Sequence, residues 1–309
     1  TGKRKFALVE RSFIIIMRKS KGKIIFDIFN YALMILLVII TIYPFLYVIF
    51  ASFSDPAELI KLNGILLRPA GFSLEGYKAV ISNKEIFTGY MNTIFYVVVG
   101  TSCSVFFTIL TAYPLSKKNL KYGRYVMLMI LFTMFFSGGM IPSYLTVKNL
   151  GLLNTRGAII IPGLILTYNL IIMRTSFSAI PSAVEESAKI DGANDFTILF
   201  RVVVPLSWSV IAVMVLYYGV GQWNAWFNAS IYLKDRKLFP LQLFLREILI
   251  NSSTDKMVQS AGNGSGAKAS LEEVLKNALV VVSTVPIMIV YPFLQKYFVK
   301  GVMIGAVKG

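Results

Sequence analysis

The chain has 309 residues, of which 56% are hydrophobic and only 15% are charged, and its mean hydropathy is +0.69. This composition is too apolar for a soluble domain of that length and predicts a polytopic membrane protein. The absence of histidine excludes a histidine-based catalytic dyad and a histidine metal site. A single cysteine, Cys103, excludes internal disulfides and thiolate metal clusters.

Residues 1–23 form a basic N-terminal segment in which eight lysines and arginines face a single acid, Glu10. The apolar core of this segment, Phe13–Met17, is too short for a signal peptide. We therefore expect residues 6–20 to lie as an amphipathic anchor on the cytoplasmic face of the membrane.

Six segments carry the roughly 20 mostly apolar residues that are needed to cross a bilayer. They are Ile24–Phe53, Gly89–Leu115, Tyr125–Val147, Ala158–Ile180, Val202–Leu233 and Ala278–Phe298. No acidic or basic residue lies near the centre of a span, since Asp27 and Arg174 fall close to span ends. Proton- or ion-coupled transport usually needs ionisable groups at membrane depth, so a self-sufficient secondary transporter is disfavoured.

The basic residues predict the orientation of these spans. The loop after the second span has no acid and four cations, Lys117, Lys118, Lys121 and Arg124. The positive-inside rule places this loop and the N-terminal segment in the cytoplasm. Six spans within residues 24–299 then put both termini inside, with 300–309 as a cytoplasmic tail, 181–205 in the cytoplasm and 234–276 outside. The net charge of +16 is explained by a basic surface beside anionic lipid and does not require nucleic acid.

The polar segment 181–205 stands between the fourth and fifth apolar spans and predicts a docking surface. Ser182 and Glu185 have the spacing of a capping box, which predicts a helix start just after Pro181. Gly192 interrupts that helix and predicts a bend, after which Asn194 or Asp195 can cap a second short helix. An ordinary interfacial loop is the alternative interpretation.

The fifth span and the exported loop contain the side chains that suit contacts outside the cytoplasm. Sugars bind to aromatic faces and to amide side chains, so we expect a substrate pathway at Tyr217, Tyr218, Gln222, Trp223, Asn224 and Asn228. An interfacial aromatic belt is the alternative for Trp223 and Trp226. The segment 234–249 is amphipathic, and we expect it to contact a solute-binding protein through Phe239, Leu241, Leu243 and Phe244. The stretch 251–269 is expected to be flexible.

Glu186, Ser187 and Ala188, followed by Gly192, Val202 and Val204–Pro205, have the spacing E-A-A-x3-G-x9-I-x-L-P. This resembles the EAA loop of binding-protein-dependent ABC importers. Serine replaces one alanine, and two valines stand where isoleucine and leucine are usual. The wider sequence, including GQWNAWFNASIYLKDRKLFPLQL and YFVKGVMIGAVKG, is similar to MalG-type permeases of carbohydrate importers over essentially the whole chain. FFSGGMIPSYLTVKNLGLLNT resembles the LplC/YtcP subgroup.

The resemblance implies a MetI/MalG-like, all-α transmembrane domain with six helices in the cytoplasmic membrane of a bacterium, by the subgroup a Gram-positive one. The EAA loop would be a coupling helix that docks on an ATPase. Its implied contact residues are Glu185, Glu186, Ser187, Ala188, Asp191, Gly192, Ala193, Phe196 and Pro205. The tail from Lys296 is similar to one that reaches the ATPase dimer, and its glycines suggest an extended segment.

The implied function is a non-catalytic permease subunit that imports an oligosaccharide. The expected partners are a MalF-like second permease, two ATP-binding subunits, an extracellular lipoprotein or periplasmic solute-binding protein, the oligosaccharide and membrane lipid. No cofactor is expected on this chain, since ATP and Mg²⁺ would bind to the partner ATPases. The alternatives are a permease for a non-sugar solute and, from another class, a membrane scaffold that recruits a cytoplasmic partner.

Overall fold

The computed structural model describes residues 21–62, 64–259 and 266–306, in which helices are joined by turns and loops and the only β-structure is one isolated β-bridge, Ser54 to Phe72. The N-terminal half contains α2 (Lys21–Ser52), α3 (Pro56–Lys61), α4 (Glu75–Ser82), α5 (Lys84–Phe95), the π-helical η1 (Tyr96–Gly100), α6 (Thr101–Ser116), α7 (Gly123–Phe135), α8 (Met140–Asn149), α9 (Gly157–Ile160) and the 3-10 turn η2 (Ile161–Gly163). The C-terminal half contains α10 (Thr167–Ser178), α11 (Ser182–Ile190), α12 (Asp195–Ile198), the π-helical η3 (Leu199–Val203), α13 (Val204–Leu206), α14 (Trp208–Trp223), α15 (Phe227–Tyr232), the 3-10 turn η4 (Arg236–Leu238), α16 (Leu241–Gln259) and α17 (Gly266–Ala306).

Three helical stretches of the described residues are long and apolar enough to cross a membrane unbroken: Gly22–Ser52, Lys84–Ser116 and Leu271–Pro292. They correspond to the first, second and sixth predicted spans. The other three predicted spans are bent helix pairs, with angles of 116° between α7 and α8, 50° between η2 and α10, and 85° between α13 and α14. The prediction of an all-helical membrane protein is therefore confirmed, whereas these three spans are not single straight helices.

Each bend lies at a sequence feature that interrupts helical hydrogen bonding. Gly139 joins α7 to α8 with a φ of +84°, a conformation that favours glycine. Pro162 lies in the turn before α10, and Pro205 lies just before the break at Ser207. Proline removes one backbone donor and clashes with the preceding helical turn, so each bend has a local cause.

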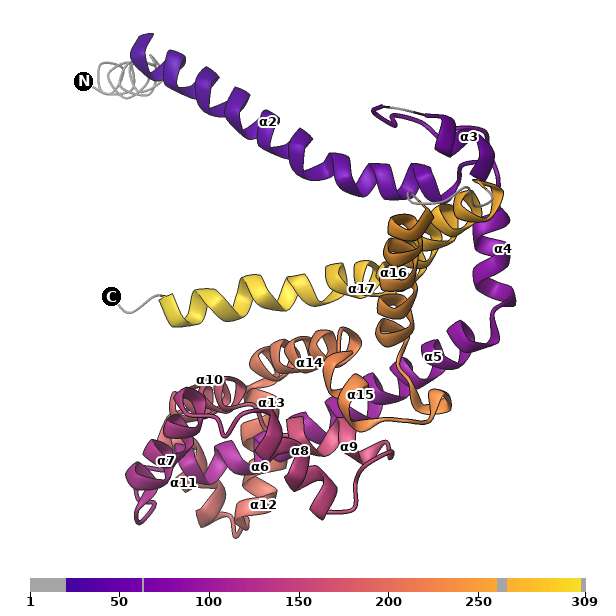
Figure 1. The fold of residues 1–309 in the computed structure, drawn as a ribbon. Helices are drawn as coiled ribbons and strands as arrows, with labels where there is room; N and C mark the ends of the chain where they lie inside the picture. The colour runs from indigo at the N-terminus through magenta and orange to yellow at the C-terminus, as the bar shows by residue number, and fades with distance from the viewer. Residues whose placement is uncertain (1–20, 63, 260–265, 307–309) are drawn as a thin grey trace, which may run out of the picture.

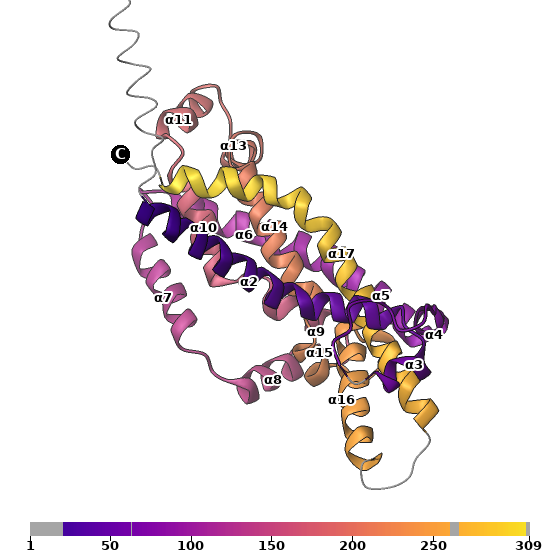
Figure 2. The same ribbon diagram turned by 90° about the horizontal axis from the view of Figure 1, so that it is seen from above.

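The molecule is elongated, and its two ends carry different elements (Figures 1 and 2). One end holds α11, the beginning of α7, the beginning of α2 and the end of α17. The opposite end holds α3 and α4. In Figure 2, α7 runs away from the other helices and α8 returns toward α15, and α7 has no buried residue.

The largest buried apolar cluster lies where α6, α10 and α14 pack together, and it includes Ile109, Met173 and Met214. Ile198 and Val203, from α12 and η3, belong to the same cluster. The segment that joins α10 to α14 is therefore fixed to the helical core by its own apolar side chains.

Two predictions about chain flexibility differ from the structure. The stretch 251–269 was expected to be flexible, but its residues 251–259 and 266–269 belong to α16 and α17, while 260–265 lie outside the described residues. The C-terminal tail was expected to be extended, but α17 continues to Ala306. A glycine costs about 1 kcal/mol in a helix interior, yet adding a turn to a helix that already exists avoids the cost of nucleation. The predicted anchor at residues 6–20 lies outside the described residues.

Candidate functional site

The segment 181–205 forms a helix, a glycine turn and a second helix, as the sequence predicted. Helix α11 begins at Ser182, directly after Pro181, and ends at Ile190. Asn194 caps α12, because its Oδ1 accepts a 2.8 Å hydrogen bond from the backbone N–H of Thr197. The turn between the two helices therefore has a defined geometry at both of its ends.

Gly192 forms the C-terminal cap of α11 with a φ of +82°. Its backbone N–H donates to the carbonyl of Lys189 at 3.0 Å, and the N–H of Ala193 donates to the carbonyl of Ala188 at 3.0 Å. This pair of bonds is a Schellman motif. The side chains of Ala188 and Ala193 both pack against the main apolar cluster, as the motif usually requires. Gly192 thus sets the angle at which α11 leaves the core.

The predicted capping box is absent, because the N-terminus of α11 has no side-chain cap. Glu185 instead forms an ion pair with Lys117, which lies just after the end of α6. The Nζ atom of Lys117 also lies 4.0 Å from the centroid of the Tyr113 ring. Both charged side chains are partly buried, which makes this pair less screened than a surface pair. Glu185 therefore connects α11 to the end of α6 and acts as a positioning residue.

The surface of this segment that remains open combines one acid with large apolar side chains. Glu186 is exposed, as are Ile190 (86% of its area) and Phe196 (69%). A groove of about 1150 Å³ lies between α11–α12 and the loop after α6, and Glu186 and Phe196 line it. Exposed apolar side chains beside a groove are typical of a protein–protein contact.

The other predicted coupling residues lie on the same two helices or just beyond them. Ser187 and Asp191 are exposed, and the hydroxyl of Ser187 donates to the carbonyl of Ala183 at 2.8 Å. Pro205 is exposed in α13. An ion pair of 3.6 Å between Lys189 and Asp195 spans the glycine turn, but both side chains are exposed, so its contribution is small.

The predicted substrate-pathway residues divide into a buried and an accessible group. Tyr218 is 2% exposed, and its hydroxyl is hydrogen-bonded to Thr108 at 2.7 Å and to the N–H of Leu166 at 3.1 Å. Trp223 is 7% exposed and donates to the carbonyl of Ser283 at 3.0 Å. Both side chains pack within the chain and are not accessible to a ligand in this structure, so a pathway role for them stays a prediction.

The accessible group stays a prediction. Tyr217 and Asn224 are exposed, while Gln222 and Asn228 are partly exposed. The Nδ2 of Asn224 donates to the carbonyl of Val220 in the preceding helix at 3.0 Å. These four side chains are available to a ligand or to a second subunit.

The four apolar residues predicted to contact a solute-binding protein are instead buried in this chain. Phe239, Leu243 and Phe244 pack in one cluster with Tyr96, and Leu241 is fully buried in another. These side chains are not accessible to a second protein in this structure, so the contact of this segment with a solute-binding protein stays a prediction. The amphipathic pattern was real, but its apolar face covers α5 and η1 of the same chain.

Several polar residues that the sequence did not single out fix this outer segment. Asn154 accepts hydrogen bonds from the N–H groups of Lys234 and Asp235 at 2.9 and 2.8 Å. Asn92 donates to the carbonyls of Lys237 and Phe239 at 2.6 and 3.1 Å. Nothing in the local sequence around either asparagine indicates a partner so far along the chain. A φ of +59° at Asn154 shows a turn that its residue type permits.

Arg236 forms a second connection at this end of the molecule. Its guanidinium binds both carboxylate oxygens of Glu85, at 2.9 and 3.0 Å, and contacts Glu247 at 3.0 Å. These bonds to carboxylates raise the pKa of the Arg236 guanidinium further above its ordinary value. The charged network fixes η4 against the beginning of α5 and against α16.

Comparison with known proteins gives one consistent result. The family described as binding-protein-dependent transport system inner membrane component matches residues 69–304. The polygalacturonan/rhamnogalacturonan transport system permease protein YtcP of Bacillus subtilis is 43% identical over 92% of this chain and 99% of its own length. Protein LplC of the same organism is 42% identical over 95% and 98%. A solved bacterial ABC transporter involved in the import of the acidic polysaccharide alginate contains a chain that matches with a TM-score of 0.82 and 34% identity, over 91% and 99% of the two chains.

Proposed function

Because this chain belongs to the family of binding-protein-dependent transport system inner-membrane components, we propose that it is the permease subunit of an ATP-driven importer that carries an oligosaccharide. The chain is a multi-pass component of the cytoplasmic membrane, and a subunit of this family is not itself an enzyme. Uptake of a solute against its gradient then needs energy from a partner ATPase. The segment 181–205 would be the surface on which that ATPase docks.

The proposed topology has six spans and cytoplasmic termini. Three unbroken helices and three bent pairs supply six crossings if each pair counts as one. The beginning of α2, the end of α17 and α11 lie at the same end of the molecule in both views (Figures 1 and 2). The basic loop at 117–124 lies at that end too, since Lys117 contacts Glu185 of α11. The positive-inside rule assigns this end to the cytoplasm.

The observation that carries the proposal is the construction of the α11–α12 segment. Its buried residues Ile198 and Val203 belong to the main core, and its exposed residues Glu186, Ile190 and Phe196 face outward. A rigid surface helix that is fixed to spanning helices can transmit a displacement of a docked ATPase as a rigid-body movement. We propose that Glu186 binds a basic or hydrogen-bonding group of that ATPase in the adjoining groove.

The proposed complex contains a second, MalF-like permease, two ATPase subunits that hold ATP and Mg²⁺, and an extracellular solute-binding protein. One bundle supplies only part of an alternating-access pathway. The apolar stretch of α2 agrees with a second permease and lipid, because none of that stretch is buried by the chain itself. We place the complex in a Gram-positive membrane, which the two Bacillus subtilis relatives support.

For the substrate, we propose an oligosaccharide with acidic sugars as the first class to test. The names of two matching proteins refer to polygalacturonan/rhamnogalacturonan and to the acidic polysaccharide alginate. Within this chain, Tyr217, Gln222, Asn224 and Asn228 are the accessible candidates for the pathway. A non-sugar solute is the second candidate. A membrane scaffold remains the alternative from another class, but it would not require substrate-dependent ATP hydrolysis.

The test is substrate-stimulated ATP hydrolysis by the complex reconstituted in proteoliposomes, together with uptake of labelled acidic and neutral oligosaccharides. Glu186→Lys and Gly192→Pro should abolish stimulation while the complex still assembles. Glu75→Lys makes the same charge change on an exposed residue of α4 at the opposite end, and it should leave stimulation intact. Full stimulation in both loop variants would refute coupling through this segment, and uptake that does not depend on the chain would refute the permease assignment.

A further inference from the structure

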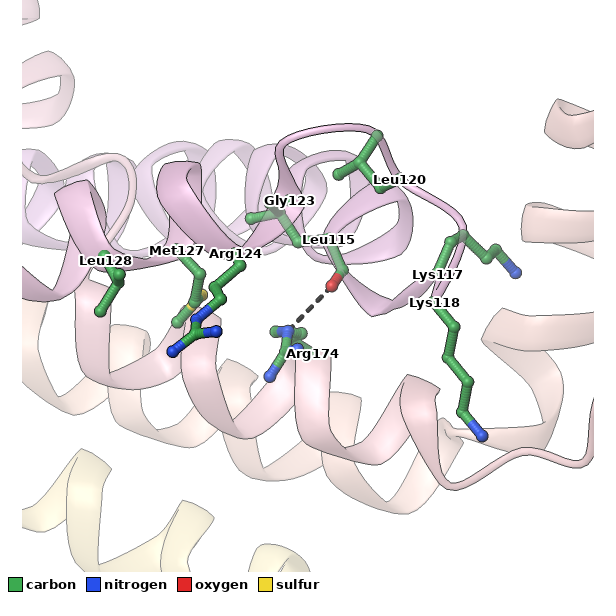
Figure 3. Close-up of a pocket in the computed structure, with 9 residues that line it drawn as sticks. All are labelled: Leu115, Lys117, Lys118, Leu120, Gly123, Arg124, Met127, Leu128 and Arg174. Carbon is green, nitrogen blue, oxygen red and sulfur yellow. Dashed lines mark hydrogen bonds between the residues drawn. The ribbon is translucent and has the colours of Figure 1, made fainter.

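A second, smaller pocket lies beside the coupling segment and has a different chemical character. Its volume is about 320 Å³, and it lies among the end of α6, the beginning of α7 and helix α10 (Figure 3). The lining consists of Leu115, Lys117, Lys118, Leu120, Gly123, Arg124, Met127, Leu128 and Arg174. Four of these nine side chains are cationic and none is acidic.

The positive charge of this pocket is only partly balanced by the protein. Lys117 pairs with Glu185 on its far side. The Nε of Arg174 donates to the carbonyl of Leu115 at 2.8 Å, as Figure 3 shows, and this bond adds no negative charge. Within the described residues, Lys118, Arg124 and Arg174 form no ion pair. Like charges held close together repel, so the arrangement favours an anionic ligand.

The apolar residues of the pocket lining favour an anionic lipid over a free anion. Leu115 ends the second span, and Met127 and Leu128 continue along α7, which has no buried residue. Tyr122 and Tyr125 are 65% and 66% exposed at the beginning of α7, where aromatic residues mark the membrane–water boundary. A free anion would use only the arginines and lysines. An anionic phospholipid would also place an acyl chain along the apolar side of α7.

We propose that this pocket binds the headgroup of an anionic phospholipid of the cytoplasmic leaflet. Basic pockets between spanning helices on the cytoplasmic side suit such headgroups. Arg124 and Arg174 hold the phosphate, and Leu120, Met127 and Leu128 contact the beginning of an acyl chain. Lys117 lies between this lipid and Glu185, so the bound lipid stabilises the loop that supports α11. The lipid site does not depend on which solute the importer carries.

The test measures lipid bound to the purified full-length chain, together with any subunits that accompany it, by native mass spectrometry in detergent. Phosphatidylglycerol and phosphatidylcholine with identical acyl chains are titrated separately. We expect the unaltered protein to prefer phosphatidylglycerol and Arg124→Gln to weaken that binding about tenfold, as the loss of one hydrogen bond to a charged group predicts. Arg124→Lys should restore most of it.

Lys121→Gln is the matched control, because Lys121 is an exposed cation of the same loop that does not line the pocket. It removes the same charge and should leave binding unchanged. An equal loss in Lys121→Gln would mean a diffuse basic surface and would overturn the proposal. Equal binding of the two lipids would do the same. Displacement of the lipid by millimolar inorganic phosphate would assign the site to a free anion. Arg124 is exposed, so the melting temperature should stay constant across the series.

Discussion

Substitution of Gly192 tests whether the angle of α11 controls coupling. The residue has a φ of +82°, and a Cβ atom built there would meet no atom within 4 Å. A larger side chain would therefore fit into the space, and the cost of the change comes from the backbone conformation alone. Residues other than glycine lose roughly 1–2 kcal/mol in the left-handed region, which reduces the population of the native turn about 5- to 30-fold relative to alternatives.

The left-handed conformation of residue 192 predicts an order of activity among its variants that does not follow side-chain size. Asparagine tolerates the left-handed region better than alanine, and a β-branched valine tolerates it worst. Substrate-stimulated ATP hydrolysis by the reconstituted complex should therefore fall in the order Gly192, Asn, Ala, Val. The alanine variant should lose about 5-fold or more of the stimulation. The basal activity of the ATPase subunits should stay unchanged, since in the proposed complex those subunits, and not this chain, hold ATP.

Gly221→Ala is the matched control for that series. Gly221 lies in α14, has no positive φ, and also has open space around its Cβ position. The added methyl group should be neutral or slightly stabilising there, because alanine favours a helix. If alanine at position 192 stimulates as well as glycine, or if asparagine is worse than alanine, the left-handed cap does not control coupling and the reasoning fails.

Three further substitutions test the remaining parts of the site. Lys117→Glu should reduce substrate-stimulated ATP hydrolysis several-fold, because the new carboxylate repels Glu185. The double variant Lys117→Glu with Glu185→Lys restores opposite charges and should recover part of the stimulation. An equal loss in the single and the double variant would contradict a direct ion pair. Glu186→Gln keeps the size of the exposed side chain and should weaken ATPase binding in a co-purification titration without lowering the melting temperature of the chain. Trp223→Phe removes the hydrogen bond to the carbonyl of Ser283 and should destabilise the chain by about 1 kcal/mol, as measured by thermal unfolding. The apparent KM for uptake should stay constant. A raised KM would support a role of Trp223 in the substrate pathway.

The sequence predicted the coupling segment well wherever the cause was local. The helix start after Pro181, the bend at Gly192 and the Asn194 cap each depend on one residue and its neighbours. The capping box failed because Glu185 is paired with a residue 68 positions away. No periodicity connects Lys117 to α11, so only the folded chain can show that partner.

The bends in three spans lie at glycine and proline residues that are present in the sequence, but a criterion based on the average apolar character of a 20-residue window does not detect them. A window of 20 apolar residues tolerates one proline or two glycines without losing its apolar character. Gly139, Pro162 and Pro205 nevertheless break the helix geometry in those windows. Proline and glycine in membrane helices should therefore be read as candidate break points even inside a convincing span, because neighbouring helices can satisfy the freed backbone groups.

The burial of outer-end residues that were predicted to contact other molecules has one physical cause. An amphipathic or aromatic pattern identifies an apolar face, but it does not identify which molecule covers that face. Phe239 and Trp223 lie under this chain's own helices, whereas no residue in the apolar stretch of α2 or in α7 is buried. In a membrane, exposed apolar surface can be covered by lipid as well as by protein. Only the polar groups beside that surface therefore indicate which of the two covers it. The cations at the beginning of α7 favour lipid there, while the acid and apolar residues of α11–α12 favour a protein partner.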